Sequence, residues 1–84
     1  MSQTEMLELL NNYNTMDRII IKKNLRRIMK EKNIKVKDIV KLGYSVPNAY
    51  AWINPSAKNI PMFDQVLNLG VYYNFDVKEF LKIG

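Results

Sequence analysis

Residues 34–54 read IKVKDIVKLGYSVPNAYAWIN, two short segments of helical character separated by a turn. The first segment is closed by Gly43, the residue type that most readily adopts the left-handed backbone after a helix. Ser45 is a favourable N-cap for the second segment, and Pro47 is tolerated in a first helical turn because its missing N–H would be unpaired there. The stretch therefore predicts two helices joined by a tight turn, at about 35–42 and 46–54.

The sequence before this stretch predicts two more helices. Ser2 and Glu5 have the spacing of a capping box, and the apolar residues that follow at helical spacing indicate a helix at about 3–13: Met6, Leu9, Leu10 and Tyr13. We expect Thr15 to cap a second helix that runs to about Lys32. The apolar face of this second helix comprises Ile21, Leu25, Ile28 and Met29, and the basic residues are expected on the opposite face.

The sequence after the stretch predicts a loop and further helical segments. Asn54 and Pro55 begin a turn-rich loop, and Pro61 is expected to open the next helix. Asn74 is a candidate for the left-handed position at the end of that helix, and Asp76 for the cap of a last turn at 77–81. No segment alternates apolar and polar residues for long, so the predicted fold class is all-α, a compact bundle of five to six helices.

Length and composition restrict the classes of function. A chain of 84 residues, 48% of them hydrophobic, is enough for one domain and too short for two. The sequence has neither Cys nor His, which removes the usual ligands of zinc, the disulfide framework, and nucleophilic or acid–base systems built on those residues. We therefore expect a protein that is not an enzyme and that has neither a cofactor nor a metal site.

The positive charge is concentrated in one segment. Of the thirteen basic residues, ten lie within residues 18–41, where only Glu31 and Asp38 oppose them. This segment therefore carries a formal charge of +8, and the rest of the chain carries −3. Such an asymmetry is typical of a surface that meets phosphate, although basic helix faces without a partner are also common.

The order of the predicted helices and of the turn between them resembles the Cro/CI-type (XRE-like) phage repressor family of helix-turn-helix domains. Residues 24–34 are similar to that family's first helix, and Leu42-Gly43-Tyr44-Ser45 with Trp52-Ile53-Asn54 is similar to its turn and to the end of its recognition helix. The resemblance covers about residues 20–81, with residues 1–18 as an additional N-terminal helix of the same domain. It implies a sequence-specific, double-stranded DNA-binding transcriptional regulator of phage or mobile-element type, a repressor rather than an activator, acting as a homodimer.

The resemblance also implies which residues meet DNA. Base edges would be read from the start and middle of the recognition helix, by Val46, Pro47, Asn48, Tyr50 and Ala51. The phosphate backbone would be met by Lys35, Lys37, Ser45, Lys58 and Asn59. Asn48 is the strongest candidate for specificity, because a side-chain amide can pair with two atoms of adenine. Its alternative role is that of a solvated Asn near the helix cap.

Two registers of the recognition helix are compatible with the sequence. An alignment without a gap from Ile34 turns Tyr50 and Ile53 inward, whereas one anchored on the turn and on the Trp-x-Asn pattern turns Ala49 and Trp52 inward. We prefer the second register because it accounts for Ser45, Pro47, Trp52 and Asn54 together. Trp52 is then a core residue and not a platform on which nucleotide bases stack.

A second function is open because the recognition helix contains neither Arg nor Gln. A protein-binding inhibitor or antirepressor on the same scaffold would use the apolar stripe of the N-terminal helix as a partner face. That stripe is equally expected as a dimer contact or as a lid on the core. The acidic start and the absence of a long apolar run indicate a cytoplasmic protein that does not enter a membrane.

Overall fold

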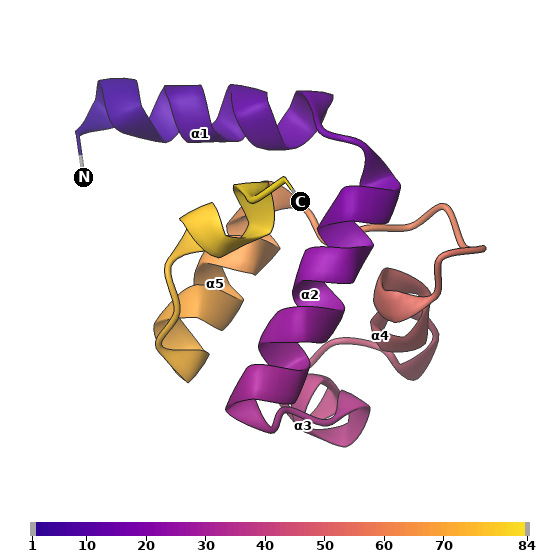
Figure 1. Ribbon diagram of the computed structural model, residues 1–84. Coiled ribbons are helices and arrows are strands. Elements are labelled where there is room, and N and C mark those ends of the chain that lie inside the picture. Colours follow the sequence, from indigo (N-terminus) through magenta and orange to yellow (C-terminus); the bar gives the residue numbers. More distant parts are fainter. Residues whose placement is uncertain (1, 84) are drawn as a thin grey trace.

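The computed structural model describes residues 2–83 and consists of five α-helices and one 3-10 helix, η1 (Figure 1). Their bounds are α1 Gln3–Thr15, α2 Arg18–Lys32, α3 Val36–Lys41, α4 Val46–Ile53, α5 Phe63–Tyr73 and η1 Val77–Leu81. No strand occurs between residues 2 and 83, which confirms the predicted all-α class. Nor is any helix in this part of the chain both long and apolar enough to span a membrane.

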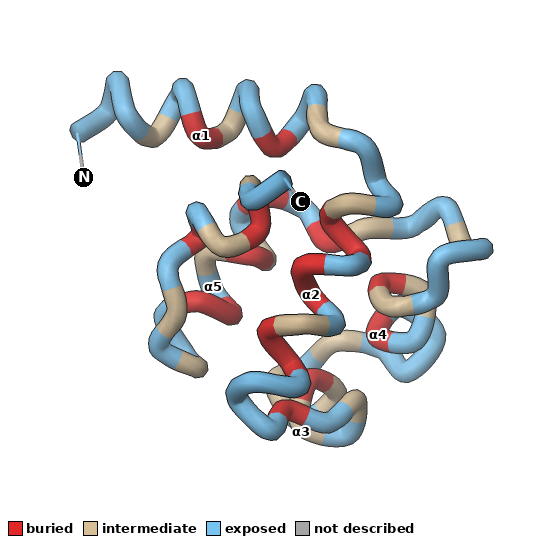
Figure 2. Tube along the Cα trace, viewed as in Figure 1, coloured by how far each residue is buried: buried red, intermediate tan, exposed pale blue. Residues whose placement is uncertain are grey.

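α2 is the central helix. In Figure 1, α3 and α4 lie at its lower end and on one side, α5 and η1 lie on the other side, and α1 crosses the opposite end. The buried residues of all these elements form a single hydrophobic cluster, and Figure 2 shows them on the inward side of each helix. Ile21, Leu25 and Ile28 of α2 are almost fully buried at its centre, as the helical spacing predicts.

Several predicted helix ends are confirmed. The Ser2 hydroxyl caps α1 by accepting a hydrogen bond from the backbone N–H of Glu5 at 3.1 Å. Gly43 has φ +107°, a backbone conformation that side chains rarely adopt, and Asn74 ends α5 in the left-handed region at φ 60°. Asp76 caps η1 through the N–H of Lys78 at 2.9 Å.

Two predicted helix starts are wrong. Thr15 does not cap α2, because it is still the last residue of α1 and its hydroxyl donates to the carbonyl of Asn11 at 2.9 Å. Asp17 is the cap, and its carboxylate accepts from the N–H of Ile19 at 2.8 Å. Pro61 does not open α5, which begins two residues later at Phe63.

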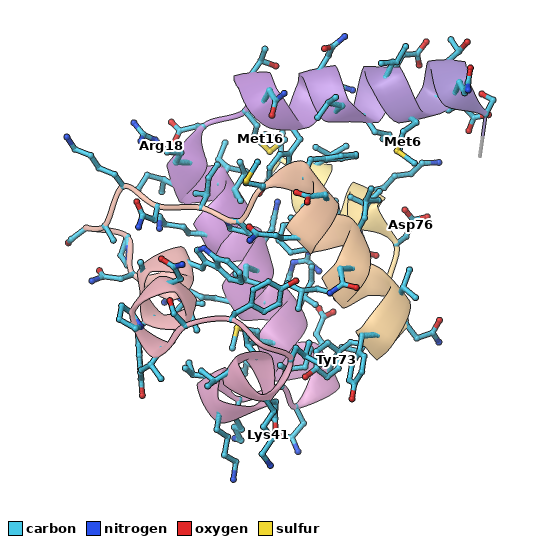
Figure 3. The ribbon with its side chains drawn as sticks, turned by 180° about the vertical axis from the view of Figure 1, so that it is seen from behind. Met6, Met16, Arg18, Lys41, Tyr73 and Asp76 are labelled. Atoms are coloured by element: carbon cyan, nitrogen blue, oxygen red, sulfur yellow. The ribbon has the colours of Figure 1, made fainter. Side chains whose placement is uncertain are left out.

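Pro61 has a different role, which involves α1. The Tyr13 hydroxyl donates to the Pro61 carbonyl at 2.6 Å, and the Tyr13 ring packs on Phe63 with 5.7 Å between ring centroids. Burial raises the pKa of the Tyr13 phenol, which keeps it a hydrogen-bond donor. Figure 3 shows Met6 and Met16 on the same inward side of α1. The apolar stripe of α1 therefore covers the core of its own chain.

Polar side chains of α2 hold η1. The buried amide of Asn24 donates to the carbonyls of Phe80 and Lys82 at 2.9 and 2.8 Å. Arg27 donates to the Glu79 carbonyl at 2.9 Å and pairs with the Glu79 carboxylate at 3.4 Å. Lys82 pairs with the same carboxylate at 2.7 Å. The end of the described chain is thus attached to the central helix through its backbone.

Candidate nucleic-acid interface

The candidate interface is built on α3, α4 and the turn between them. Gly43 and Ser45 shape this turn, and the Ser45 hydroxyl accepts from the N–H of Asn48 at 3.2 Å. The Tyr44 ring lies edge-on to Trp52 with 5.1 Å between centroids, and its hydroxyl accepts from the Asn68 amide of α5 at 3.0 Å. The turn is therefore fixed to both α4 and α5.

α4 has one buried face and one exposed face. Ala49 is 0% exposed and Trp52 is 3% exposed, whereas Tyr50 is 57% exposed and Ile53 is half-buried. This pattern confirms the register anchored on the turn and on the Trp-x-Asn pattern, and it makes Trp52 a core residue. The outer face of α4 consists of Val46, Pro47, Asn48 and Tyr50. Ala51, the fifth predicted base-reading residue, is half-buried at the edge of this face.

Asn48 carries the specific hydrogen-bonding capacity of the outer face. Its backbone N–H is used by the Ser45 cap, but its exposed side-chain amide has no hydrogen-bond partner within residues 2–83. An amide offers one acceptor and two donors, which match the N6 and N7 atoms of adenine in the major groove. Val46 and Pro47 offer only apolar contact, such as that with a thymine methyl group.

The predicted phosphate-contacting residues surround α4 in the chain. Lys35 and Lys37 lie exposed at the start of α3, where the Lys35 N–H is occupied by the Asp38 carboxylate at 2.8 Å. The Ser45 hydroxyl accepts from Asn48 and keeps its own proton free to donate. Lys58 and Asn59 are exposed in the loop between α4 and α5. All five side chains are accessible to a ligand.

Lys22 lies in an unexpected place. It is 1% exposed, and its ammonium group donates to the carbonyls of Ala51 in α4 and Asn59 in the following loop. The expectation that every basic residue of α2 lies on the solvated face is therefore wrong for Lys22. Lys22 lies three residues before Leu25 and seven before Met29, a spacing that places it at the edge of the core face of α2. This spacing could have indicated from the sequence that Lys22 is buried.

Lys22 and Arg18 together fix the loop that carries Lys58 and Asn59. Arg18 donates to the Lys58 carbonyl at 3.3 Å, and Lys22 donates to the Asn59 carbonyl at 2.5 Å. Burial, with a smaller contribution from the nearby Arg18 charge, lowers the pKa of Lys22. The backbone of the loop is thus held by α2, while the Lys58 and Asn59 side chains stay exposed.

The first residue of α3, Val36, has an apolar side chain. It is half-buried and packs against the core, so it supplies no contact to phosphate. Within residues 2–83 no cluster of three or more potential ligands is arranged to hold a metal ion. No protein-family model matches the chain, and comparisons with curated proteins and with solved structures give no match either.

Proposed function

We propose that this protein is a sequence-specific, double-stranded DNA-binding transcriptional regulator of the helix-turn-helix type, similar to Cro/CI-type repressors. α4 would enter the major groove, with Asn48 reading adenine and Lys35, Lys37, Ser45, Lys58 and Asn59 meeting phosphates. The protein has no catalytic role in this proposal. It acts in the cytoplasm, and it represses by occupying an operator.

The observation that carries this proposal is the outer face of α4. α4 contains no charged residue, and its outer face presents Asn48 among apolar groups above the buried Ala49 and Trp52. Cations lie on both sides of it in the chain, on α3 and in the loop after α4. An amide on an uncharged helix surface, flanked by lysines, matches the division of DNA recognition into base contacts and phosphate contacts.

The proposal includes a homodimer on a pseudo-palindromic operator. One helix of eight residues contacts too few base pairs to select a site in a genome. Two copies related by a two-fold axis would read half-sites about 34 Å apart, one turn of the duplex.

The test is a selection experiment. A random A/T-rich duplex pool is titrated with the protein at two salt concentrations, binding is followed by fluorescence anisotropy, and the retained duplexes are sequenced. We expect enrichment of a two-fold-symmetric site. Weak binding that vanishes with salt and enriches no sequence would overturn the proposal, because it would reflect charge alone. That result would favour the protein-binding alternative. The apolar stripe of α1, which that alternative expects as the partner face, packs on the core of its own chain.

A further inference from the structure

The outward face of α2 bears a row of cations beside a cleft. The cleft has a volume of about 480 Å³ and lies between α2 and the residue that follows the C-cap of α4. It is lined by Ile19, Lys22, Lys23, Arg26, Arg27, Lys30 and Pro55. Figure 2 shows exposed segments along this helix alternating with the buried ones.

The charge of this row is uncompensated. Lys23, Arg26 and Lys30 are exposed, and none of them takes part in an ion pair or side-chain hydrogen bond within the described residues. They are spaced three and four residues apart, so their side chains are neighbours on the helix. Like charges at these spacings destabilise a helix, and an anion bound along the row would remove that cost.

The row is continuous with the candidate interface. Pro55, which forms one wall of the cleft, follows the C-cap of α4, and Lys22 ties the last turn of α4 and the subsequent loop to α2. α2 and α4 lie side by side in Figure 1. A duplex that received α4 in its major groove would therefore bring a strand near this face.

We propose that Lys23, Arg26 and Lys30 bind the phosphodiester backbone of the duplex that α4 reads. This inference rests on the proposed function and adds a second set of phosphate contacts, separate from those of Lys35 and Lys37 on α3. Seven residues of helix span about 10 Å, which is the axial length of about three nucleotides of one strand.

The chemistry of the cleft favours a phosphodiester over an acidic protein. The cations follow a line, as phosphates do along a strand. Among the residues that line the cleft, only Ile19 and Pro55 have apolar side chains, and both lie outside the core. An interface with a protein usually has buried aromatic anchors such as Trp and Tyr, and the lining of this cleft contains neither.

The first test compares two triple variants of equal charge. K23Q/R26Q/K30Q removes the row, and K32Q/K78Q/K82Q removes three lysines elsewhere; each lowers the formal charge from +5 to +2. We expect the row variant to reduce the slope of log K against log salt by about 2 to 3 units while the selected sequence stays the same. The control variant should change the slope by less than one unit. Equal changes in both variants would overturn the inference, and circular dichroism verifies that both are folded.

The second test separates this inference from the proposed function. Amide resonances of the full chain are followed by NMR while the duplex enriched by selection, or the random A/T-rich pool where none is enriched, is added. Shifts at both the row and α4 are expected. Shifts at α4 without shifts at the row overturn the phosphate contact and leave the regulator intact. Shifts at the row alone support the phosphate contact and overturn base reading by α4, and shifts at neither overturn both.

Discussion

α1 and α4 are both amphipathic helices with one face in the same core, but their outer faces differ. The outer face of α1 is polar and includes Glu8, Asn11 and Asn12, with Leu7 as a single large apolar exception. The outer face of α4 has no charge and exposes Val46 and Tyr50 by 50% and 57%. Water solvates the first surface well and the second poorly. The contrast distinguishes α1, which covers the core, from α4, whose uncharged outer face suits the DNA contact that we propose for it.

The largest expected effect is on the stability supplied by α1. Leu9→Ala should lower the free energy of unfolding by roughly 3 kcal/mol, because Leu9 is buried in the shared core. Urea denaturation measures this loss. Leu7→Ala, on the exposed side of the same helix, is the control and should change stability by less than about 0.5 kcal/mol. Equal losses in the two variants would contradict the assignment of α1 as a cover.

Lys22 links α4 to α2, and its replacement measures how much this link stabilises the fold. Lys22→Met should cost about 2 kcal/mol of stability, because the carbonyls of Ala51 and Asn59 lose their donor while the cost of burying the charge is also removed. Thermal denaturation measures this loss of stability. Lys23→Met makes the same change at an exposed neighbour and should have almost no effect. An equally small loss of stability for Lys22→Met would contradict the inference that Lys22 stabilises the fold by binding the Ala51 and Asn59 carbonyls.

Asn48 tests the function assigned to the outer face of α4. Asn48→Ala should weaken binding to the selected duplex roughly tenfold, or about 1.4 kcal/mol, and relax base choice at one position. Anisotropy titrations against the selected site and its single-base variants measure both effects. Asn12→Ala on the outer face of α1 is the matched control and should leave affinity unchanged. Unaltered binding by the Asn48 variant would place the reading surface elsewhere.

Lys35 should have a smaller and less specific effect. Lys35→Ala should weaken binding to all duplexes alike and reduce the salt slope by about one unit, because one phosphate contact is lost. Lys78→Ala in η1 removes the same charge far along the chain and serves as the control. A change in sequence preference on replacing Lys35 would mean that it contacts a base.

The smallest expected effect concerns pH and lies on the η1 side of the core. A hydrogen bond from Lys82, together with the Arg27 charge, lowers the pKa of Glu79. The ionised carboxylate therefore stabilises the fold above the ordinary glutamate pKa of about 4.3, and this contribution is lost as the pH falls through the lowered value. Glu79→Gln should flatten the acid limb of the stability curve without altering DNA binding. An unchanged acid limb in urea titrations would contradict the contribution of this pair.

Local sequence signals predicted the helices and most of their ends. The apolar spacing of α2, the Gly43 turn, the Ser45 cap and the left-handed Asn74 are determined by residues within one or two turns of one another, and the structure has them as expected. The error at Thr15 has a local cause as well. Asp17 is a better acceptor than Thr15 for the first N–H groups of α2, and Thr15 instead bonds backward to Asn11.

Contacts between residues distant in the chain are harder to predict from the sequence. The burial of Lys22 depends on two carbonyls that lie 29 and 37 residues away along the chain. Because a carbonyl is present in every residue, the sequence contains no complementary residue type that would reveal such a partner. The same holds for Asn24, whose amide meets backbone groups of η1. The sequence left two registers open for α4, and the burial of Ala49 and Trp52 decided between them in favour of the one that leaves Asn48 exposed.

The sequence by itself determined the all-α class, the turn between α3 and α4 and the apolar inward faces of α1 and α2, because these follow from backbone preferences and apolar spacing. Only the tertiary structure decided that α1 covers the core, that Lys22 braces α4 and the loop after it, and that the α2 cations line a cleft beside Pro55. These features require groups distant in sequence to meet, and their geometry depends on how the helices pack.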